Sequence, residues 1–208
     1  MAVVAITSGQ ACVAATRMLV PNERKAEVVE SVSATYGMLP VGDPSDPSKF
    51  MGPLISAPQR DRCERYIALA VEHGAKVAHG GGRPAGLEKG YYMEPTVLDL
   101  PDNANPAARD EIFGPVIGII GYEDIDDAVR IANDSPYGLS GQVYSADVAA
   151  ATSVARRIRS GAVNVNTGLF SAYAAAGGYK QSGLGRERGP EGIREFQEVK
   201  HMSIGELR

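Results

Sequence analysis

The chain has 208 residues, of which 44% are hydrophobic and 22% charged, and its formal net charge is −4 at pH 7. This composition is typical of a soluble globular protein, and without a basic excess it gives no electrostatic support for nucleic-acid binding. The longest apolar run is too short to cross a bilayer, the start shows no signal-peptide pattern, and two cysteines make no disulfide framework, so we expect a cytoplasmic protein.

The first feature along the chain is the stretch around Cys12. Gly9 and Gln10 permit a tight turn before this cysteine, and the alanines and Val13 after it favour the start of a helix. Backbone N–H groups at a helix start stabilise a thiolate and could hold an oxyanion formed on an attacked carbonyl. A free cysteine is also often a small buried hydrophobic residue, so spacing alone leaves a catalytic and a structural role equally open. Cys63 has no such turn, and we interpret it as structural or surface-exposed.

The rest of the first half alternates between helical and strand patterns. A long loop rich in proline and glycine separates two predicted helices, and short strands follow. The predicted elements are helices over 23–35 and 57–73, a loop over 36–56, and strands over 76–79 and 92–98. Gly74 closes the second helix, and Pro95 interrupts the second strand.

The second half predicts a regular alternation of strands and helices. The run VIGIIGY is continuously apolar, which is typical of a strand buried on both faces. Strands are predicted over 116–122, 139–145 and 162–166, with helices over 124–134 and 147–161 between them. This order predicts an α/β fold with a mainly parallel sheet flanked by helices. The tail over 196–204 alternates loosely and would suit an edge strand or one exchanged between chains.

Two further stretches are candidates for chemistry. Glu111 and Phe113 stand just before the strand over 116–122, where a carboxylate could bind a sugar hydroxyl, or where the residues simply form a well-made loop. The glycine-rich segment 176–189 fits neither the dinucleotide fingerprint nor a P-loop, which favours close backbone packing instead. The three histidines show no zinc-like spacing, so no metal site is expected.

Five segments of the sequence, taken together and in their order along the chain, form one recognisable pattern. They are Gly9-Gln10-Ala11-Cys12 with Arg17, EIFGPV, NDSPYGLSGQVYS, GAVNVN and GGYKQSGLGRERG. Together they resemble the C-terminal, catalytic half of the NAD(P)-dependent aldehyde dehydrogenase superfamily. The resemblance implies a three-layer α/β catalytic domain over residues 1–190. It also implies a tail over 191–208 that carries the C-terminal oligomerisation strand, and therefore a homo-oligomer.

The resemblance also assigns roles to individual residues. It implies that Cys12 is the nucleophile that forms a thiohemiacetal and then a thioester with an aldehyde. Glu111 matches the family glutamate that binds the nicotinamide-ribose hydroxyls of NAD or NADP, and Phe113 matches the aromatic residue that steadies the nicotinamide. The aldehyde tunnel is expected to be bordered by Asn166, Phe170 and Tyr173.

The sequence departs from the family pattern in two ways: some family features are not found in it, and some family residues are replaced. The dinucleotide-binding domain, the general-base glutamate and the asparagine of the oxyanion hole, which the family places before the cysteine, are not found here. Thr7 stands where the family often has asparagine, and Ala175 and Ala176 replace the usual proline and aromatic residue. We therefore expect this chain alone to be inactive or weakly active. Alternatives are a partial subunit that assembles with a separate nucleotide-binding chain, and a cysteine-dependent esterase.

Overall fold

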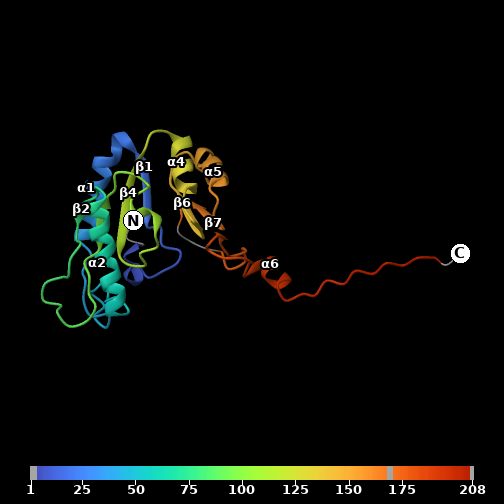
Figure 1. The fold of residues 1–208 in the computed structure, drawn as a ribbon, viewed down its shortest axis with the longest axis horizontal. Helices are drawn as coiled ribbons and strands as arrows, with labels where there is room; N and C mark the ends of the chain where they lie inside the picture. Colours follow the sequence, from blue (N-terminus) through green and yellow to red (C-terminus); the bar gives the residue numbers. More distant parts are fainter. Residues whose placement is uncertain (1–3, 168–170, 207–208) are drawn as a thin grey trace.

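A computed structural model of the chain describes residues 4–167 and 171–206 (Figure 1). Its main sheet has four strands in the order β1 (Arg17–Pro21), β4 (Val116–Tyr122), β3 (Thr96–Asp99) and β2 (Lys76–His79). β4 pairs in parallel with both β1 and β3, whereas β2 is antiparallel at the edge. The mainly parallel sheet that the sequence predicts is confirmed.

Two helices cover the opposite faces of this sheet. α1 (Lys25–Gly37) packs against one face through Val32 and Tyr36, which are both fully buried. α2 (Ala57–Glu72) packs against the other face through a cluster that includes Cys63 and Ile67. Helix, sheet and helix thus form the three layers expected of an α/β domain.

The side chains of β4 alternate between the two faces. Ile117 and Ile119 join the cluster beneath α1, while Val116 and Ile120 join the cluster beneath α2. All four are no more than 2% exposed. Burying a side chain of this size stabilises a fold by about 1.5–3 kcal/mol, so β4 is the centre of the core. The prediction that this strand is buried on both faces is confirmed.

The boundaries of the neighbouring elements follow local chemistry. The Ser56 hydroxyl accepts a hydrogen bond from the Gln59 N–H and caps the N-terminus of α2. The helix ends shortly before Gly74, whose backbone is left-handed. β3 begins at Thr96, directly after Pro95, because proline cannot donate to the ladder. A short helix, α3 (Pro106–Arg109), follows β3.

The second half of the chain builds a smaller unit beside the main sheet (Figure 1). β6 and β7 form a parallel pair covered by α5, and α4 lies between this unit and β4. β5 and β8 form a short antiparallel pair, and α6 follows them. Their bounds are α4 (Ile125–Asn133), β5 (Tyr137–Gly138), β6 (Ser140–Val143), α5 (Val148–Arg157), β7 (Ala162–Val165), β8 (Tyr179–Lys180) and α6 (Gly189–Arg194). α5 ends several residues before the predicted boundary.

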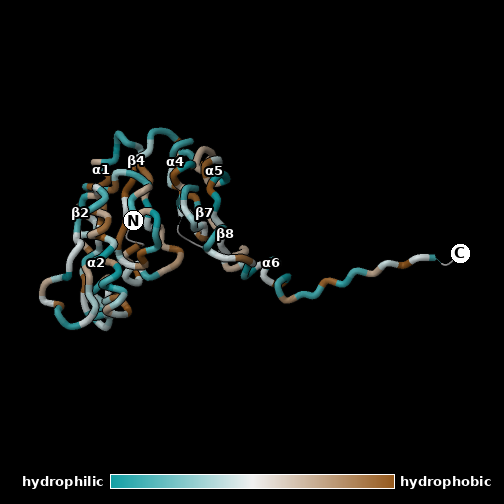
Figure 2. Tube along the Cα trace, in the orientation of Figure 1, coloured by the Kyte–Doolittle hydropathy of each residue, from teal (hydrophilic) through white to brown (hydrophobic). Residues whose placement is uncertain are grey.

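The C-terminal tail leaves the body of the molecule in Figures 1 and 2. Residues 197–206 form neither helix nor strand, so the strand expected over 196–204 is not formed in this single chain. Phe196, Val199 and Ile204 are each more than 90% exposed there. Pairing of this tail with a second chain stays a prediction.

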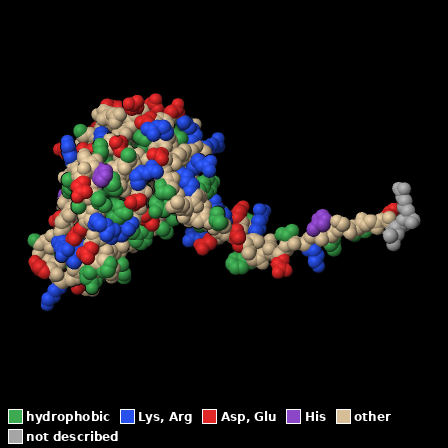
Figure 3. Space-filling model, in the orientation of Figure 1, with side chains coloured by type: hydrophobic (Ala, Val, Ile, Leu, Met, Phe, Trp, Pro, Cys, Tyr) green, Lys and Arg blue, Asp and Glu red, His purple; other side chains and the backbone are tan. Residues whose placement is uncertain are grey.

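The surface of the body mixes charges of both signs. Figure 3 shows basic and acidic side chains interspersed over the visible face. Within residues 4–167 and 171–206, no helix combines the length and the apolar character that crossing a bilayer requires.

Candidate active site

The backbone before Cys12 forms a tight left-handed turn. Thr7, Ser8 and Gly9 have φ values of 55°, 56° and 72° within the short 3-10 segment η2 (Ile6–Gly9). The left-handed region suits glycine and disfavours a β-branched residue such as threonine. The turn predicted at Gly9 is confirmed, and it begins two residues earlier than the glycine.

Hydrogen bonds fix this turn on the loop before α2. The Ser8 hydroxyl donates to the Gly52 carbonyl over 2.9 Å, and the Ile55 N–H donates to the Gln10 side-chain oxygen over 3.0 Å. Ser8 is buried. The strained conformation is therefore held by tertiary contacts rather than by local preference.

Cys12 lies in a turn, and the prediction that a helix starts there is wrong. The Ala14 N–H donates to the Ala11 carbonyl over 3.0 Å, and β1 begins at Arg17. The segment becomes a strand because its pairing with β4 buries Val20 in the core, which outweighs the weak helix propensity of the alanines. The Cys12 side chain is exposed, so a reagent or substrate can reach its thiol.

A stack of close backbone contacts joins this turn to the loop before β4. An added Cβ on Gly9 would lie 2.0 Å from the Gly114 carbonyl oxygen, and one on Gly114 would lie 2.2 Å from the Cys63 sulfur. Cys63 is fully buried, and burial raises the pKa of its thiol to about 11. Cys63 is thus structural, and it supports the loop that the Cys12 turn packs on.

The loop that bears Glu111 and Phe113 is tied to α2. The Gln59 side-chain amide donates to the carbonyls of Ile112 and Phe113, over 2.9 and 2.8 Å. Arg62 donates to the Glu111 carbonyl over 2.5 Å. Glu111 is exposed, Phe113 is half-buried and its backbone is left-handed, with a φ of 62°. The structure thus leaves the Glu111 side chain in solvent and the Phe113 side chain partly exposed, on a loop that α2 holds.

The other side of the Cys12 turn contacts the smaller unit. The Ser140 hydroxyl, at the start of β6, donates to the Val13 carbonyl over 3.2 Å. Asn166 follows β7 at the opposite end of this strand pair, four residues beyond the register partner of Ser140 and roughly 13 Å along the strand. Its side-chain amide exchanges two hydrogen bonds with the Ser145 backbone. The structure therefore shows Asn166 bracing the end of β6.

Of the remaining predicted tunnel residues, the structure describes Tyr173, which lies on the surface. Tyr173 is 89% exposed. Phe170 lies outside the described residues. One hollow of about 710 Å³ runs beside α1 near Lys25 and Asp99, and another of about 440 Å³ lies near His79, so neither is lined by a predicted site residue.

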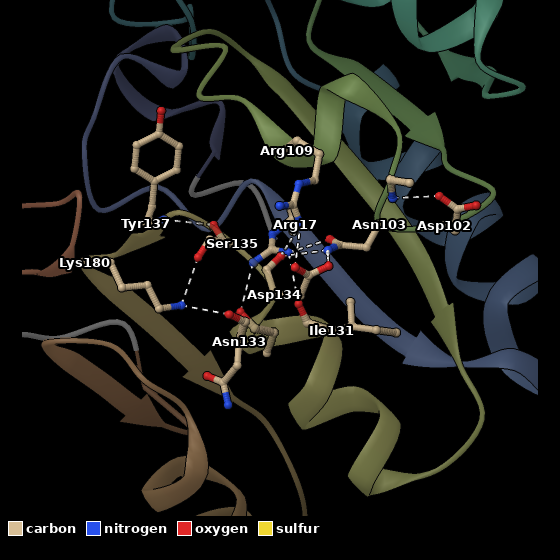
Figure 4. Close-up of polar contacts among 12 residues, drawn as sticks. Arg17, Asp102, Asn103, Arg109, Ile131, Asn133, Asp134, Ser135, Tyr137 and Lys180 are labelled. Carbon is tan, nitrogen blue, oxygen red and sulfur yellow. Dashed lines mark hydrogen bonds and ion pairs between the residues drawn. The ribbon is translucent and has the colours of Figure 1, made fainter.

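A polar network that sequence reasoning did not anticipate surrounds Arg17, the first residue of β1 (Figure 4). Arg17 donates to the Asn103 side chain over 2.6 Å and to the carbonyls of Ile131 and Ala132 at the end of α4. Burial and the nearby charge of Arg109 lower the pKa of Arg17, yet a guanidinium stays protonated at any physiological pH. The network therefore fixes β1, the strand that follows the Cys12 turn.

Asp134 is the acidic centre of the same network. It forms an ion pair with Arg109 at 2.8 Å and accepts a hydrogen bond from Asn103, and these contacts hold the pKa of Asp134 below its usual range. Lys180 donates to the Asn133 carbonyl over 2.8 Å. The motifs NDS, which contains Asn133 and Asp134, and GGYK, which ends in Lys180, can be read from the sequence. That they lie close to Arg17 follows only from the fold.

Other chemistries find little support in the described part of the chain. No group of three or more His, Cys, Asp or Glu residues there could hold a metal ion. The hydrogen bonds made by the His73 and His201 rings go to Leu69 and Ser203, and none joins Cys12 within the described ranges. No observation therefore favours the esterase alternative.

Comparison with known proteins identifies the family. The model of the aldehyde dehydrogenase family matches residues 1–202. This chain belongs to that family. A curated relative from Staphylococcus saprophyticus is 43% identical over 201 residues, which cover 96% of this chain and 42% of the relative. The chain thus spans about two fifths of the length of that relative.

Solved structures of the family agree with the fold. A Mycobacterium tuberculosis aldehyde dehydrogenase complexed with NAD+ is 47% identical, with a TM-score of 0.91, over 93% of this chain and 40% of that chain. A mutant aldehyde dehydrogenase C from Pseudomonas syringae, complexed with NAD+ and octanal, is 43% identical, with a TM-score of 0.92, over 96% of this chain and 41% of that chain. The α/β architecture is therefore that of the family.

Proposed function

We propose that this chain carries the nucleophile and the nicotinamide-facing loop of an NAD(P)-dependent aldehyde oxidation. One observation carries the proposal: Gly9 of the nucleophile turn packs directly on Gly114, the residue after Phe113. The exposed thiol of Cys12 and the loop expected to hold the cofactor therefore belong to one rigid assembly. The NAD+ complexes of homologous enzymes support the choice of cofactor.

The chemistry assigned to this chain begins at Cys12. An unperturbed thiol has a pKa of about 8.5, so it must lose its proton before or during attack. The thiolate attacks the aldehyde carbon, and the Cys12 backbone N–H would hold the oxyanion of the thiohemiacetal together with an amide side chain from the complementing domain. NAD(P)+, when bound, accepts the hydride of the substrate carbon. Water then cleaves the Cys12 thioester, which releases the carboxylic acid and restores the thiol.

Two residues would hold the cofactor. The Glu111 carboxylate would bind the ribose hydroxyls, and the Phe113 ring would contact the nicotinamide. Both sit on a loop whose backbone is anchored to α2, so they are presented from a rigid support. Asn166, Phe170 and Tyr173 remain proposed borders of the aldehyde tunnel.

The assembly state forms part of the proposal. The exposed apolar side chains of the tail support a homo-oligomer in which this segment pairs with another copy. We also propose that full turnover needs a nucleotide-binding domain, in the same assembly or from a complementing chain, and that the isolated 208 residues turn over slowly or not at all. The cytoplasmic location stays a prediction.

Thiol labelling of this chain tests the proposed nucleophile. A maleimide at pH 7.5 should label the exposed Cys12 quickly and leave the buried Cys63 unlabelled, because its pKa of about 11 keeps it protonated. Saturating octanal should slow the labelling of Cys12 by forming a thiohemiacetal. The Cys12→Ser variant is the control for both measurements.

Each outcome has a distinct meaning. Labelling of Cys12 that an aldehyde does not slow would contradict its role as the nucleophile. NADH formation by this chain alone, absent in Cys12→Ser, would confirm the oxidation and contradict the expectation of low activity in isolation.

A further inference from the structure

The backbone conformation of Phe113 calls for an explanation. Its φ of 62° lies in the left-handed region, which a bulky aromatic residue rarely adopts. Residues held in such a conformation persist only where the surroundings over-determine them, and they cluster at functional sites. The contacts that impose the conformation should therefore reveal a residue that matters to the site.

Gln59 contacts both carbonyls of this bend, while the Arg62 guanidinium donates to only one of the two, that of Ile112, over 3.2 Å. The Gln59 amide nitrogen lies 2.9 Å from the Ile112 carbonyl oxygen and 2.8 Å from the Phe113 carbonyl oxygen. In extended backbone, successive carbonyls point in opposite directions, so a single amide cannot reach both. They point the same way only when the residue between them leaves the extended region. A primary amide has two N–H donors, one for each of these acceptors.

Gln59 is itself firmly placed. Its backbone N–H is bonded to the Ser56 hydroxyl that caps α2, so it lies in the first turn of a long helix. One turn further along α2, the buried Cys63 supports Gly114, on which Gly9 packs. The same helix face thus supports both the Phe113 loop and, through it, the nucleophile turn.

We infer that Gln59 is a positioning residue that holds Phe113 in its left-handed conformation and so sets where its ring meets the nicotinamide. Gln59 acts through the backbone carbonyls of residues 112 and 113. The inference rests on the proposed function for its consequence, but the conformational part can be measured without any cofactor.

Fluorine NMR on the full 208-residue chain tests the conformational part. Replacing the four phenylalanines by 4-fluorophenylalanine gives four signals, and Phe113→Tyr assigns one of them. Gln59→Leu keeps the bulk and removes both donors. We expect the Phe113 signal to move at least halfway to its position in the denatured chain, or to split, while the signal of the exposed Phe196 stays in place. Gln181→Leu, the same exchange at an exposed position, should change nothing.

Two variants keep this comparison decisive. Should Gln59→Leu fail to fold, Gln59→Asn retains the amide but is one methylene too short to reach both carbonyls, and it should move the same signal. A Phe113 signal unchanged in a folded Gln59 variant would overturn the inference. A shift of the Phe113 signal in Gln181→Leu as large as that in Gln59→Leu would also overturn it.

NAD+ titration separates the inference from the proposed function. If the wild-type Phe113 signal does not respond to NAD+, even with a complementing nucleotide-binding domain added, the proposed cofactor contact fails, while the Gln59 comparison still stands or falls by itself. If it does respond, Gln59→Leu should weaken NAD+ binding about tenfold, as expected when only about a tenth of the molecules keep the competent conformation. An unchanged affinity beside a shifted signal would contradict a positioning role.

Discussion

The contact between the nucleophile turn and the loop before β4 can be measured with two matched glycines. Gly9 has a φ of 72° and Gly86 a φ of 78°, so an alanine suffers similar backbone strain at both positions. At Gly86, no atom lies within 4 Å of the added Cβ. At Gly9, the Cβ would meet the Gly114 carbonyl oxygen at 2.0 Å and the Pro115 nitrogen at 2.6 Å. The difference between the two substitutions therefore isolates this contact.

The expected magnitudes follow from these geometries. Gly86→Ala should cost about 1–2 kcal/mol of the free energy of unfolding, the price of a left-handed alanine. Gly9→Ala adds a clash with buried backbone, and overpacking of this kind costs about 1–3 kcal/mol more. Where the turn relieves the clash by moving, part of that cost should appear instead as a changed rate of Cys12 labelling.

Urea unfolding followed by far-UV circular dichroism measures the first quantity, and maleimide labelling of Cys12 measures the second. Gly86→Ala should leave the labelling rate unchanged. If Gly9→Ala and Gly86→Ala lowered the stability equally, and Cys12 labelling were the same in both, the packing of Gly9 on Gly114 would be refuted, and with it the main support for the proposed site.

Two further substitutions test how the turn and its strand are held. Thr7→Asn should stabilise the chain by about 0.5–1 kcal/mol, because asparagine tolerates the left-handed φ of 55° better than threonine. The same exchange at Thr152, inside α5, should give no gain in stability. A loss of stability in Thr7→Asn would show that the turn is not strained. Arg17→Met should cost about 2–4 kcal/mol, because it leaves three part-buried acceptors without their charged donor. Arg24→Met, which removes a solvent-exposed ion pair, should leave the urea midpoint nearly unchanged, and equal effects of the two arginine substitutions would contradict the network.

Local patterns were sufficient to predict much of the fold. The apolar run of β4 and the capped, periodic sequence of α2 carry their own signals, and both elements lie where the sequence placed them. The helix expected after Cys12 failed because helix propensity amounts to tenths of a kcal/mol per residue, whereas strand β1 gains a place in the core. Pairing with a strand far along the chain decides that segment, and no local window contains it.

The candidate site was predictable only as separate pieces. Cys12, Glu111 and Phe113 follow from motifs, but the contact between Gly9 and Gly114 and the meeting of Arg17 with Asn103 join residues distant in sequence. The two-carbonyl contact of Gln59 gave no sequence signal, because a glutamine in the first turn of a helix is ordinary. Side-chain geometry was needed to single it out.

The parallel pairing of β1 with β4 also bears on the order of events during synthesis. Arg17 pairs with Gly118, so the strand beside the nucleophile turn has no partner until about 100 further residues are made, roughly 5–20 s at ribosomal rates. Throughout that interval the Cys12 thiol is attached to an unfolded segment. The Cys12 thiol thus leaves the ribosome about 100 residues before the strand that fixes the neighbouring β1 in place.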